Sequence, residues 1–180
     1  MSYDEFYVKS VIRSLPDWPE PGVMFRDITP LFKDPKALRM VADSFIQRYM
    51  ESDITHIACI DARGFLIASI MAYQMQKPLV LVRKKGKLPG KTIHQEYQLE
   101  YGTSAVEMQL DSVGSGDRVL VFDDLIATGG TILAACTLIK KLGAEVVECA
   151  ALIDLPDLDG SLRIQETGIP VYTMLAYEGL

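Results

Sequence analysis

Two adjacent aspartates, Asp123 and Asp124, follow the apolar run 119–122 and precede a run of small and hydroxylic residues. Neighbouring carboxylates repel each other and lose hydration when buried. A neutral residue would therefore end a strand at a lower cost in free energy. Carboxylate oxygens accept hydrogen bonds and bind hard cations. The pair therefore predicts a partner that brings positive charge or hydroxyl donors, such as Mg²⁺ or the diol of a sugar.

The segment after the two acids predicts a phosphate site. Residues 127–131 read Ala-Thr-Gly-Gly-Thr, and apolar residues from Ile132 to Leu142 then recur at helical spacing. A glycine-rich turn at the start of a helix offers backbone N–H groups and the positive end of the helix dipole, which suit a phosphate. One loop could thus hold a phosphate beside a polyol.

A basic cluster stands out in a chain whose formal net charge is -6. Five of the 18 lysines and arginines fall between Arg83 and Lys91, directly after the apolar run 78–82. A solvated loop is the plain alternative for such a cluster. Because the cluster follows a buried strand and precedes a glycine-punctuated segment long enough to be a lid, it predicts contact with a small polyanion.

Alternating strands and helices would position these residues. The pattern predicts helices at about 34–50, at 65–75 and from 131 onward, and strands at 56–60, 78–82, 104–111, 119–122, 145–153 and near 171. Such alternation predicts an α/β fold with a mostly parallel sheet flanked by helices. Ligands bind beyond the carboxyl ends of the strands in such sheets, where "DARGF", "RKKGK" and "DDLIATGGT" all fall.

Composition narrows the class of protein. A chain of 180 residues predicts one domain, and 49% hydrophobic residues leave apolar surface for a subunit interface. Neither a signal peptide nor a membrane span is expected, which predicts a cytoplasmic protein. Three widely spaced cysteines in apolar sequence predict reduced core thiols. The net charge of -6 argues against a nucleic-acid surface.

Other catalytic fingerprints are missing from the chain. There is no G-x-x-x-x-G-K-[ST] sequence, and "GSGDRV" from Gly114 lacks the third glycine of a dinucleotide-binding turn. The two histidines, His56 and His94, do not lie beside a marked nucleophile. His56, at a strand start, predicts a structural role, and His94 lies in the segment interpreted as a lid.

The apolar run, the two acids and "ATGGT" together resemble the 5-phosphoribosyl-1-pyrophosphate signature of the type I phosphoribosyltransferase family. "FRDITPLFKDP", "ARGF", "VRKKGKLPG" and "EYQLEYG" precede it in the order typical of the family's adenine-specific members. The resemblance spans about residues 25–131. One departure is Asp61, where these proteins commonly have glutamate.

The resemblance implies a fold and a reaction. The fold would be a twisted, mostly parallel sheet with a small N-terminal hood at residues 1–33, which binds the base, and a flexible lid at 84–103. The reaction would convert adenine and 5-phosphoribosyl-1-pyrophosphate to AMP and pyrophosphate with Mg²⁺. Mg²⁺ would be held mainly by the substrate, with Asp123 or Asp124 as candidates for a contact through water. Members of the family are usually homodimers.

The resemblance also implies roles in binding the phosphoribosyl pyrophosphate. Asp123 and Asp124 would accept hydrogen bonds from the ribose hydroxyls and stabilise positive charge on the sugar ring. The 5′-phosphate would lie against Ala127, Thr128, Gly129, Gly130 and Thr131. The departing pyrophosphate would be held by Arg63, Arg83, Lys84 and Lys87. A non-proline cis peptide bond would lie at Asp61-Ala62 in the same loop.

At the base, the resemblance places Phe25 as the stacking partner of adenine, with Val23 and Arg26 near its edge. In the lid, Glu100 would exchange a proton near N7 and Tyr101 would lie over the ribose. Taken without the resemblance, Phe25 is also compatible with a core position and Arg26 with an ion pair to Asp27. Two other functions remain open: transfer to hypoxanthine, guanine or xanthine, and a regulator that senses phosphoribosyl pyrophosphate without turning it over.

Overall fold

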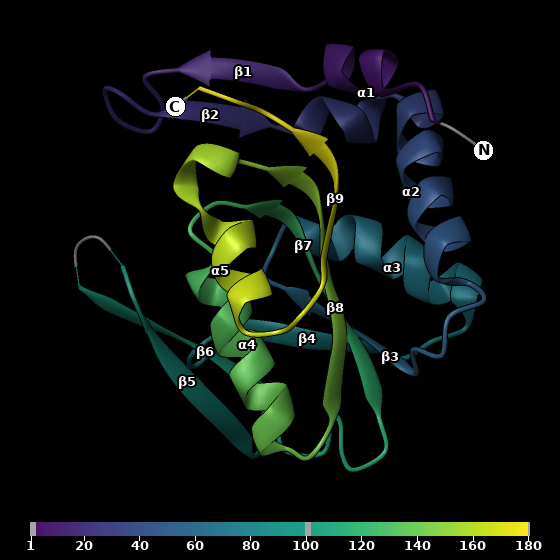
Figure 1. Ribbon diagram of the computed structural model, residues 1–180, viewed down its shortest axis with the longest axis vertical. Coiled ribbons are helices and arrows are strands. Elements are labelled where there is room, and N and C mark those ends of the chain that lie inside the picture. Colours follow the sequence, from purple (N-terminus) through teal and green to yellow (C-terminus); the bar gives the residue numbers. More distant parts are fainter. Residues whose placement is uncertain (1–2, 100–101, 180) are drawn as a thin grey trace. The chain divides into compact units, whose positions relative to one another are not determined.

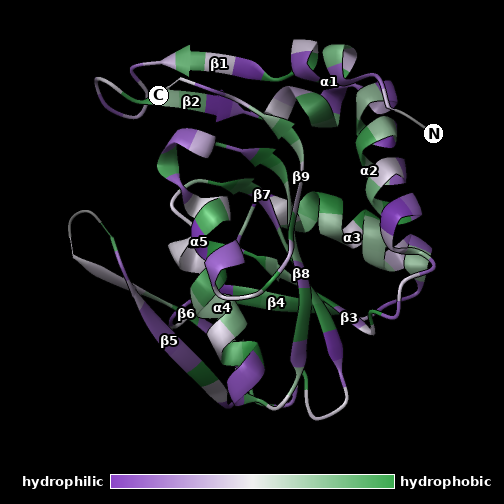
Figure 2. Ribbon diagram, in the orientation of Figure 1, coloured by the Kyte–Doolittle hydropathy of each residue, from purple (hydrophilic) through white to green (hydrophobic). Residues whose placement is uncertain are grey.

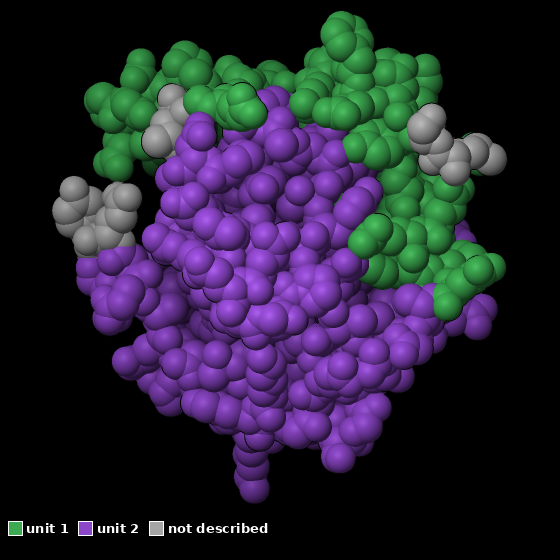
Figure 3. Space-filling view, in the orientation of Figure 1, with its two compact units in different colours: residues 1–51, 178–180 green, residues 52–177 purple. Residues whose placement is uncertain are grey.

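The computed structural model describes residues 3–99 and 102–179 of the chain. The chain divides into two compact units, one formed by residues 1–51 with 178–180 and the other by residues 52–177 (Figure 3). The predicted hood at residues 1–33 belongs to the first unit. The two acids, the phosphate turn and the basic cluster all belong to the second.

The first unit joins two helices to a small hairpin-like sheet. It contains α1 (Glu5–Val11), η1 (Thr29–Lys33) and α2 (Pro35–Tyr49), with β1 (Arg13–Pro16) antiparallel to β2 (Met24–Asp27). The carboxylate of Asp34 accepts hydrogen bonds from the backbone N–H groups of Lys36 and Ala37, so it caps α2. The predicted helix start at Asp34-Pro35 is therefore confirmed.

The second unit is a seven-stranded sheet with helices against it (Figure 1). Its strands lie in the order β5-β6-β4-β3-β7-β8-β9. Neighbours among β4, β3, β7, β8 and β9 are parallel, whereas β6 is antiparallel to both β4 and β5. The elements of this unit are β3 (His56–Ile60), α3 (Gly64–Met75), β4 (Leu79–Lys84), β5 (Thr92–Gln98), β6 (Thr103–Gln109), β7 (Arg118–Ile126), α4 (Gly130–Lys141), β8 (Glu145–Asp154), η2 (Pro156–Leu158), α5 (Gly160–Glu166) and β9 (Val171–Ala176).

Two details of this sheet differ from the sequence-based expectation. The acids do not end their strand, because β7 continues to Ile126 and pairs with β8 as far as Asp154. Residues 92–98, interpreted as part of a lid loop, form β5, which pairs with β6 along its whole length. Cross-strand pairing, which local sequence does not reveal, sets both boundaries.

The core lies on both faces of the central strands, which are coloured as hydrophobic in Figure 2. Ala58, Ile60 and Val82 pack in one cluster with residues of α4, such as Leu138 and Ile139. Because side chains alternate along a strand, Ile57 and Cys59 face the opposite side of the sheet. That side carries α3, since the space at Gly64 is closed by the sulfur of Cys59.

The cysteines match their prediction: Cys59, Cys136 and Cys149 are buried free thiols. Within the described part of the chain, no helix has both the length and the apolar composition needed to cross a bilayer. His56 is held at the start of β3, where its Nδ1 lies 2.8 Å from the hydroxyl of Thr55 and 3.7 Å from a carboxylate oxygen of Asp117.

Candidate active site

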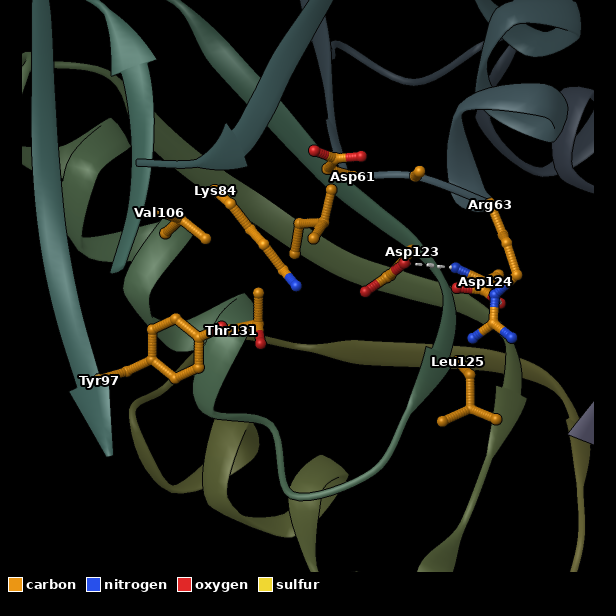
Figure 4. A pocket seen from close by; sticks show the side chains of 11 residues that line it. Asp61, Arg63, Lys84, Tyr97, Val106, Asp123, Asp124, Leu125 and Thr131 are labelled. Atoms are coloured by element: carbon orange, nitrogen blue, oxygen red, sulfur yellow. Dashed lines mark hydrogen bonds and ion pairs between the residues drawn. The ribbon is translucent and has the colours of Figure 1, made fainter. Parts of the chain in front are cut away.

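A polar cavity of about 190 Å³ lies at the carboxyl end of the parallel strands. The described residues that line it all belong to the second unit and come from six segments of the chain: the end of β3 with the following loop, β4, β5, β6, β7 and the start of α4. Figure 4 shows Lys84 and Asp123 pointing into the same space, with Tyr97 and Thr131 at its side. The lining residues are Ile60, Asp61, Ala62, Arg63, Lys84, Tyr97, Val106, Asp123, Asp124, Leu125 and Thr131.

The two acids face different surroundings. Asp124 is only 5% exposed, and its Oδ2 forms an ion pair of 2.8 Å with Nε of Arg63. Asp123 borders the cavity, and its Oδ1 accepts a 2.8 Å hydrogen bond from the backbone N–H of Asp124. Burial, and next the negative charge of Asp124, raise the pKa of Asp123 well above its usual range. A cation or a hydroxyl donor that enters the cavity would stabilise the charged form of Asp123.

Close packing fixes the acids from behind. A methyl group on Gly64, the first residue of α3, would lie 3.0 Å from Sγ of Cys59 and 3.2 Å from Oδ1 of Asp123. The helix therefore approaches the strand at a distance that only glycine permits without a shift. Burial, and then the charge of Asp123, raise the pKa of the Cys59 thiol, so this sulfur is a packing group.

The predicted phosphate turn has the expected geometry. Gly129, with φ of 80°, caps the N-terminus of α4, and the helix begins at Gly130. A second cavity of about 100 Å³ is lined by residues 125–132 together with Asp123. The free N–H groups of the first turn of α4 and the hydroxyls of Thr128 and Thr131 therefore surround a space next to Asp123, as binding of a phosphate beside a polyol requires.

The basic residues separate into two groups. Arg63 and Lys84 line the cavity, whereas Arg83 and Lys87 are not among the described residues that do so. Nε of Arg83 instead forms a 3.0 Å ion pair with Asp61, and its Nη1 donates to the carbonyl oxygen of Lys87. The non-proline cis peptide bond is present at Asp61-Ala62, as the resemblance implied.

A buried carboxylate supports the turn that carries these lysines. Glu107 of β6 is 3% exposed, and its Oε1 accepts hydrogen bonds from the backbone N–H groups of Lys87 at 2.9 Å and Leu88 at 2.7 Å. Burial alone would raise the pKa of Glu107, but backbone donors from Leu88, Gly86 and Lys87 hold it below its usual value. Glu107 therefore organises the basic turn from beneath.

Comparison with known proteins shows the family of the chain. A family model, the phosphoribosyl transferase domain, matches residues 28–166. An adenine phosphoribosyltransferase from Marinomonas sp. (strain MWYL1) is 62% identical over 179 residues, which are 99% of each chain. This chain belongs to the adenine phosphoribosyltransferase family. It is a phosphoribosyltransferase of purine salvage that forms AMP from adenine and 5-phosphoribosyl-1-pyrophosphate.

Solved structures of adenine phosphoribosyltransferases have the same fold. The enzyme from Rhodothermus marinus is 44% identical, with a TM-score of 0.90 over 96% of this chain and 97% of that chain. The enzyme from Trypanosoma brucei, in complex with AMP, pyrophosphate and ribose-5-phosphate, is 29% identical, with a TM-score of 0.87 over 95% of this chain and 78% of that chain. The expected α/β fold with a mostly parallel sheet is thus confirmed.

The adenine-contacting residues predicted from the family lie in the first unit. Phe25 is partly exposed rather than in the core, and its ring meets that of Trp18 edge-on at 4.3 Å. Val23 is exposed, and Arg26 donates to the hydroxyl of Ser14 at 2.5 Å. The alternative interpretation was an ion pair between Arg26 and Asp27. In the structure Asp27 instead pairs with Arg13 at 2.8 Å.

Two predicted residues of the adenine phosphoribosyltransferase lid, Glu100 and Tyr101, lie outside the described residues. Sequence reasoning also missed residues that the structure brings to the cavity. Tyr97 lines it from β5, and Asp61 and Val106 complete its wall. Ile93, Gln95 and Tyr97 are spaced two residues apart, and this spacing was the available signal for a strand with Tyr97 on its inward face.

Proposed function

We propose that the transfer of the phosphoribosyl group to adenine takes place in the cavity between Lys84, Asp123 and the start of α4. The observation that carries this proposal is that three kinds of binding group lie close together. A cationic side chain, a carboxylate pair and a helix N-terminus line two adjoining cavities that share Asp123, Leu125 and Thr131. Pyrophosphate, ribose and 5′-phosphate require these three in that order.

Asp123 acts on the sugar. Displacement of pyrophosphate from the anomeric carbon builds positive charge on the ribose ring, as in glycoside hydrolysis. The carboxylate of Asp123 stabilises that charge and accepts hydrogen bonds from the ribose hydroxyls. Asp124 holds Arg63 in place through their 2.8 Å ion pair and adds negative charge next to Asp123.

Pyrophosphate is held by the basic residues. Lys84 and Arg63 reach the cavity and bind the leaving group directly. Arg83 and Lys87 lie on the same turn, where Arg83 fixes Asp61 and the backbone of Lys87. They raise the positive potential that attracts the substrate to the cavity. The 5′-phosphate lies on residues 127–131, where the hydroxyls of Thr128 and Thr131 supplement the backbone N–H groups.

The cavity suits Mg²⁺ brought by the substrate. Asp123 lines it and points into the same space as Lys84, so a carboxylate of the kind that Mg²⁺ prefers lies near the proposed pyrophosphate position (Figure 4). Mg²⁺ usually keeps several waters and binds through one or two carboxylates plus substrate phosphates. Asp123, with Asp124 beside it, would hold the ion through water. When bound, the ion neutralises charge on the departing pyrophosphate.

Adenine is held by the hood and the lid. Phe25 supplies an exposed aromatic face for stacking, and backbone groups near Val23 and Arg26 read the edge of the base. Glu100 exchanges a proton near N7, and Tyr101 lies over the ribose when the lid closes. Closure excludes water, which would otherwise capture the cationic sugar and yield ribose 5-phosphate.

Two further properties belong to the proposal: a cytoplasmic location and a homodimer. The exposed side of α3 supports the dimer, because it presents Leu66 and Tyr73, with exposed fractions of 51% and 81%, beside the partly exposed Leu81 of β4. Leu81 lies on the face of the sheet that α3 covers, since Val80 and Val82 point to α4. An apolar helix face of this kind fits a second copy of the chain.

Base selectivity provides the sharpest test of the function. The purified enzyme, with Mg²⁺ and phosphoribosyl pyrophosphate, should convert adenine to AMP and reject hypoxanthine by orders of magnitude in kcat/KM. Hypoxanthine reverses the donor and acceptor pattern at N1 and the 6-position, so it would leave buried groups in the site unpaired. Comparable kcat/KM values for the two bases, measured by chromatography of the products, would overturn the assignment of base selectivity.

A further inference from the structure

The backbone at Gly160 lies directly against the phosphate turn. A methyl group on Gly160 would overlap the carbonyl oxygen of Ala127 and would lie 2.8 Å from the backbone nitrogen of Gly129. Contacts under 3.0 Å are not tolerated by real side chains, and here the opposing atoms are backbone atoms that cannot rotate away. Gly160 begins α5, in the C-terminal part of the chain that has no role in the site described above.

The contact is reciprocal. Gly129 has φ of 80°, and a methyl group there would lie 2.8 Å from the carbonyl oxygen and 3.1 Å from Cα of Gly160. Two glycines therefore allow two backbone segments, about thirty residues apart in sequence, to touch. The turn that cradles the 5′-phosphate thus has the start of α5 as its rear wall.

Gly160 is held in this position by its own helix. Ile164, one turn later, is fully buried in the core cluster that includes residues of α4. The hydroxyl of Ser161 donates a 2.7 Å hydrogen bond to Asp154 at the end of β8, and Nη1 of Arg163 donates to the carbonyl oxygen of Thr128 at 3.4 Å. Because Ile164 and Ser161 anchor α5 to the core and to β8, a clash at Gly160 would move the phosphate turn more readily than α5.

We propose that Gly160 is a positioning residue for the 5′-phosphate of the substrate. This inference rests on the proposed function, since it assumes that residues 127–131 bind that phosphate. By supporting Ala127 and Gly129 from behind, Gly160 sets the direction of the backbone N–H groups at the start of α4. The N–H groups contact the phosphate only, so Gly160 influences the 5′-phosphate and leaves the pyrophosphate subsite at Lys84 and Arg63 unaffected.

The experiment compares Gly160→Ala with Gly114→Ala. Both glycines have backbone angles outside the positive-φ region, and a methyl group on Gly114 meets no atom within 4 Å. Binding of ribose 5-phosphate and of pyrophosphate, each with Mg²⁺, is measured by titration calorimetry on the full chain. Gly160→Ala should weaken ribose 5-phosphate binding by about tenfold or more, because a small misplacement of binding groups costs up to about 10²-fold. Pyrophosphate binding should change by less than about twofold, because the atoms nearest to Gly160 belong to Ala127 and Gly129 and not to Lys84 or Arg63.

Each result of the binding measurements either supports or overturns the role of Gly160. Unchanged ribose 5-phosphate binding in Gly160→Ala overturns the inference, and so does an equal loss for both ligands, which would indicate a general disturbance. A differential loss, with Gly114→Ala like the wild type and with the KM for phosphoribosyl pyrophosphate raised more than the KM for adenine, supports it. If the wild type binds pyrophosphate but not ribose 5-phosphate, the assignment of the phosphate turn itself fails, and the inference fails with it.

A milder variant covers the case in which Gly160→Ala does not fold. Ser161→Ala removes the anchor of α5 to Asp154 without adding an atom. Its matched control is Ser112→Ala, whose hydroxyl makes a hydrogen bond of the same 2.7 Å length to the carbonyl oxygen of Gln109. Ser161→Ala should weaken ribose 5-phosphate binding about two- to fivefold, the scale of one hydrogen bond, and leave pyrophosphate binding unchanged. No difference from Ser112→Ala would contradict the role of α5.

Discussion

Two neighbouring aspartates in this site have different surroundings. Asp124, whose side chain is 7% exposed, forms an ion pair with the 40% exposed side chain of Arg63, so Asp124 is tied to the position of Arg63. Asp123 faces the cavity, and burial, followed by the negative charge of Asp124, raises its pKa. In the proposed mechanism, positive charge brought by the substrate and Mg²⁺ would stabilise the charged form of Asp123, with Asp124 in support.

The first residue-scale prediction concerns these acids. Asp123→Asn combined with Asp124→Asn should leave the fold intact and lower kcat by about 10²-fold or more, the usual loss when electrostatic stabilisation of a transition state is removed. Steady-state kinetics and circular dichroism measure the two effects. Asp111→Asn, an exposed aspartate after β6, is the control and should match the wild type. A folded double variant with near-normal kcat would show that the acids are not catalytic.

The second residue-scale prediction concerns Glu100, whose proposed role in proton exchange rests on the resemblance of "LEYG" to the lid of the family. Glu100→Ala should lower kcat by about 10²-fold or more, within the range of general acid–base catalysis, while affinity for phosphoribosyl pyrophosphate changes little. Glu100→Gln should lower kcat by a similar factor, since an amide fills the space but cannot exchange the proton. Wild-type turnover in Glu100→Gln would reduce Glu100 to a positioning residue, and wild-type turnover in Glu100→Ala would remove it from the mechanism.

At the scale of elements, the basic turn between β4 and β5 depends on one buried carboxylate. Glu107 accepts the backbone N–H groups of Lys87 and Leu88, so its negative charge is compensated by dipoles rather than by a lysine ammonium. A group whose pKa is lowered on folding contributes stability above its unfolded pKa, and this contribution is lost as pH falls through the folded value.

Glu107→Gln tests that dependence. At pH 7 the variant should be less stable than the wild type, because the neutral amide oxygen accepts the two backbone hydrogen bonds more weakly than a charged carboxylate oxygen does. The difference should shrink as pH falls below about 4.3, the usual pKa of a glutamate, because the folded wild type then keeps this carboxylate charged while the unfolded chain takes up the proton. Urea unfolding at pH 7 and pH 3.5 measures it. Glu96→Gln, the same change at an exposed position of β5, is the control. A stability difference that is constant across this range would exclude titration of Glu107 as its origin.

Features set by residues that are close in sequence could be predicted from the sequence, whereas features set by long-range contacts could not. Capping and apolar spacing predicted α2, and glycines before an apolar helical pattern predicted the phosphate turn at residues 127–131. β5 was missed because its sequence, Thr92–Gln98, contains only two apolar residues with polar residues between them. The extent of β7 past the two acids depends on pairing with β8. The contact of Gly160 with Ala127 and Gly129 has no local signal at all.

At the scale of the whole molecule, the proposed dimer would place a partner subunit close to the proposed pyrophosphate loop. The helix α3 begins at Gly64, directly after Arg63, which lines the cavity and pairs with Asp124. A partner subunit packed on Leu66 would therefore lie about one turn of α3 from Arg63. Such a contact would restrict the position of Arg63, so loss of the dimer should reduce activity as well as stability.

The last prediction tests the dimer and that connection together. The wild type at micromolar concentration should scatter light as a particle of about 40 kDa, twice the 20.0 kDa of the chain. Leu66→Asp should shift it to the monomer, because burying an unpaired carboxylate in an apolar interface costs several kcal/mol. Leu162→Asp is the matched control, since Leu162 is 53% exposed and Leu66 is 51% exposed, and it should remain dimeric. A wild type of about 20 kDa contradicts the dimer, and a Leu66→Asp protein that stays dimeric places the interface elsewhere. If the Leu66→Asp monomer keeps full kcat/KM for phosphoribosyl pyrophosphate, the partner subunit has no effect on the pyrophosphate loop.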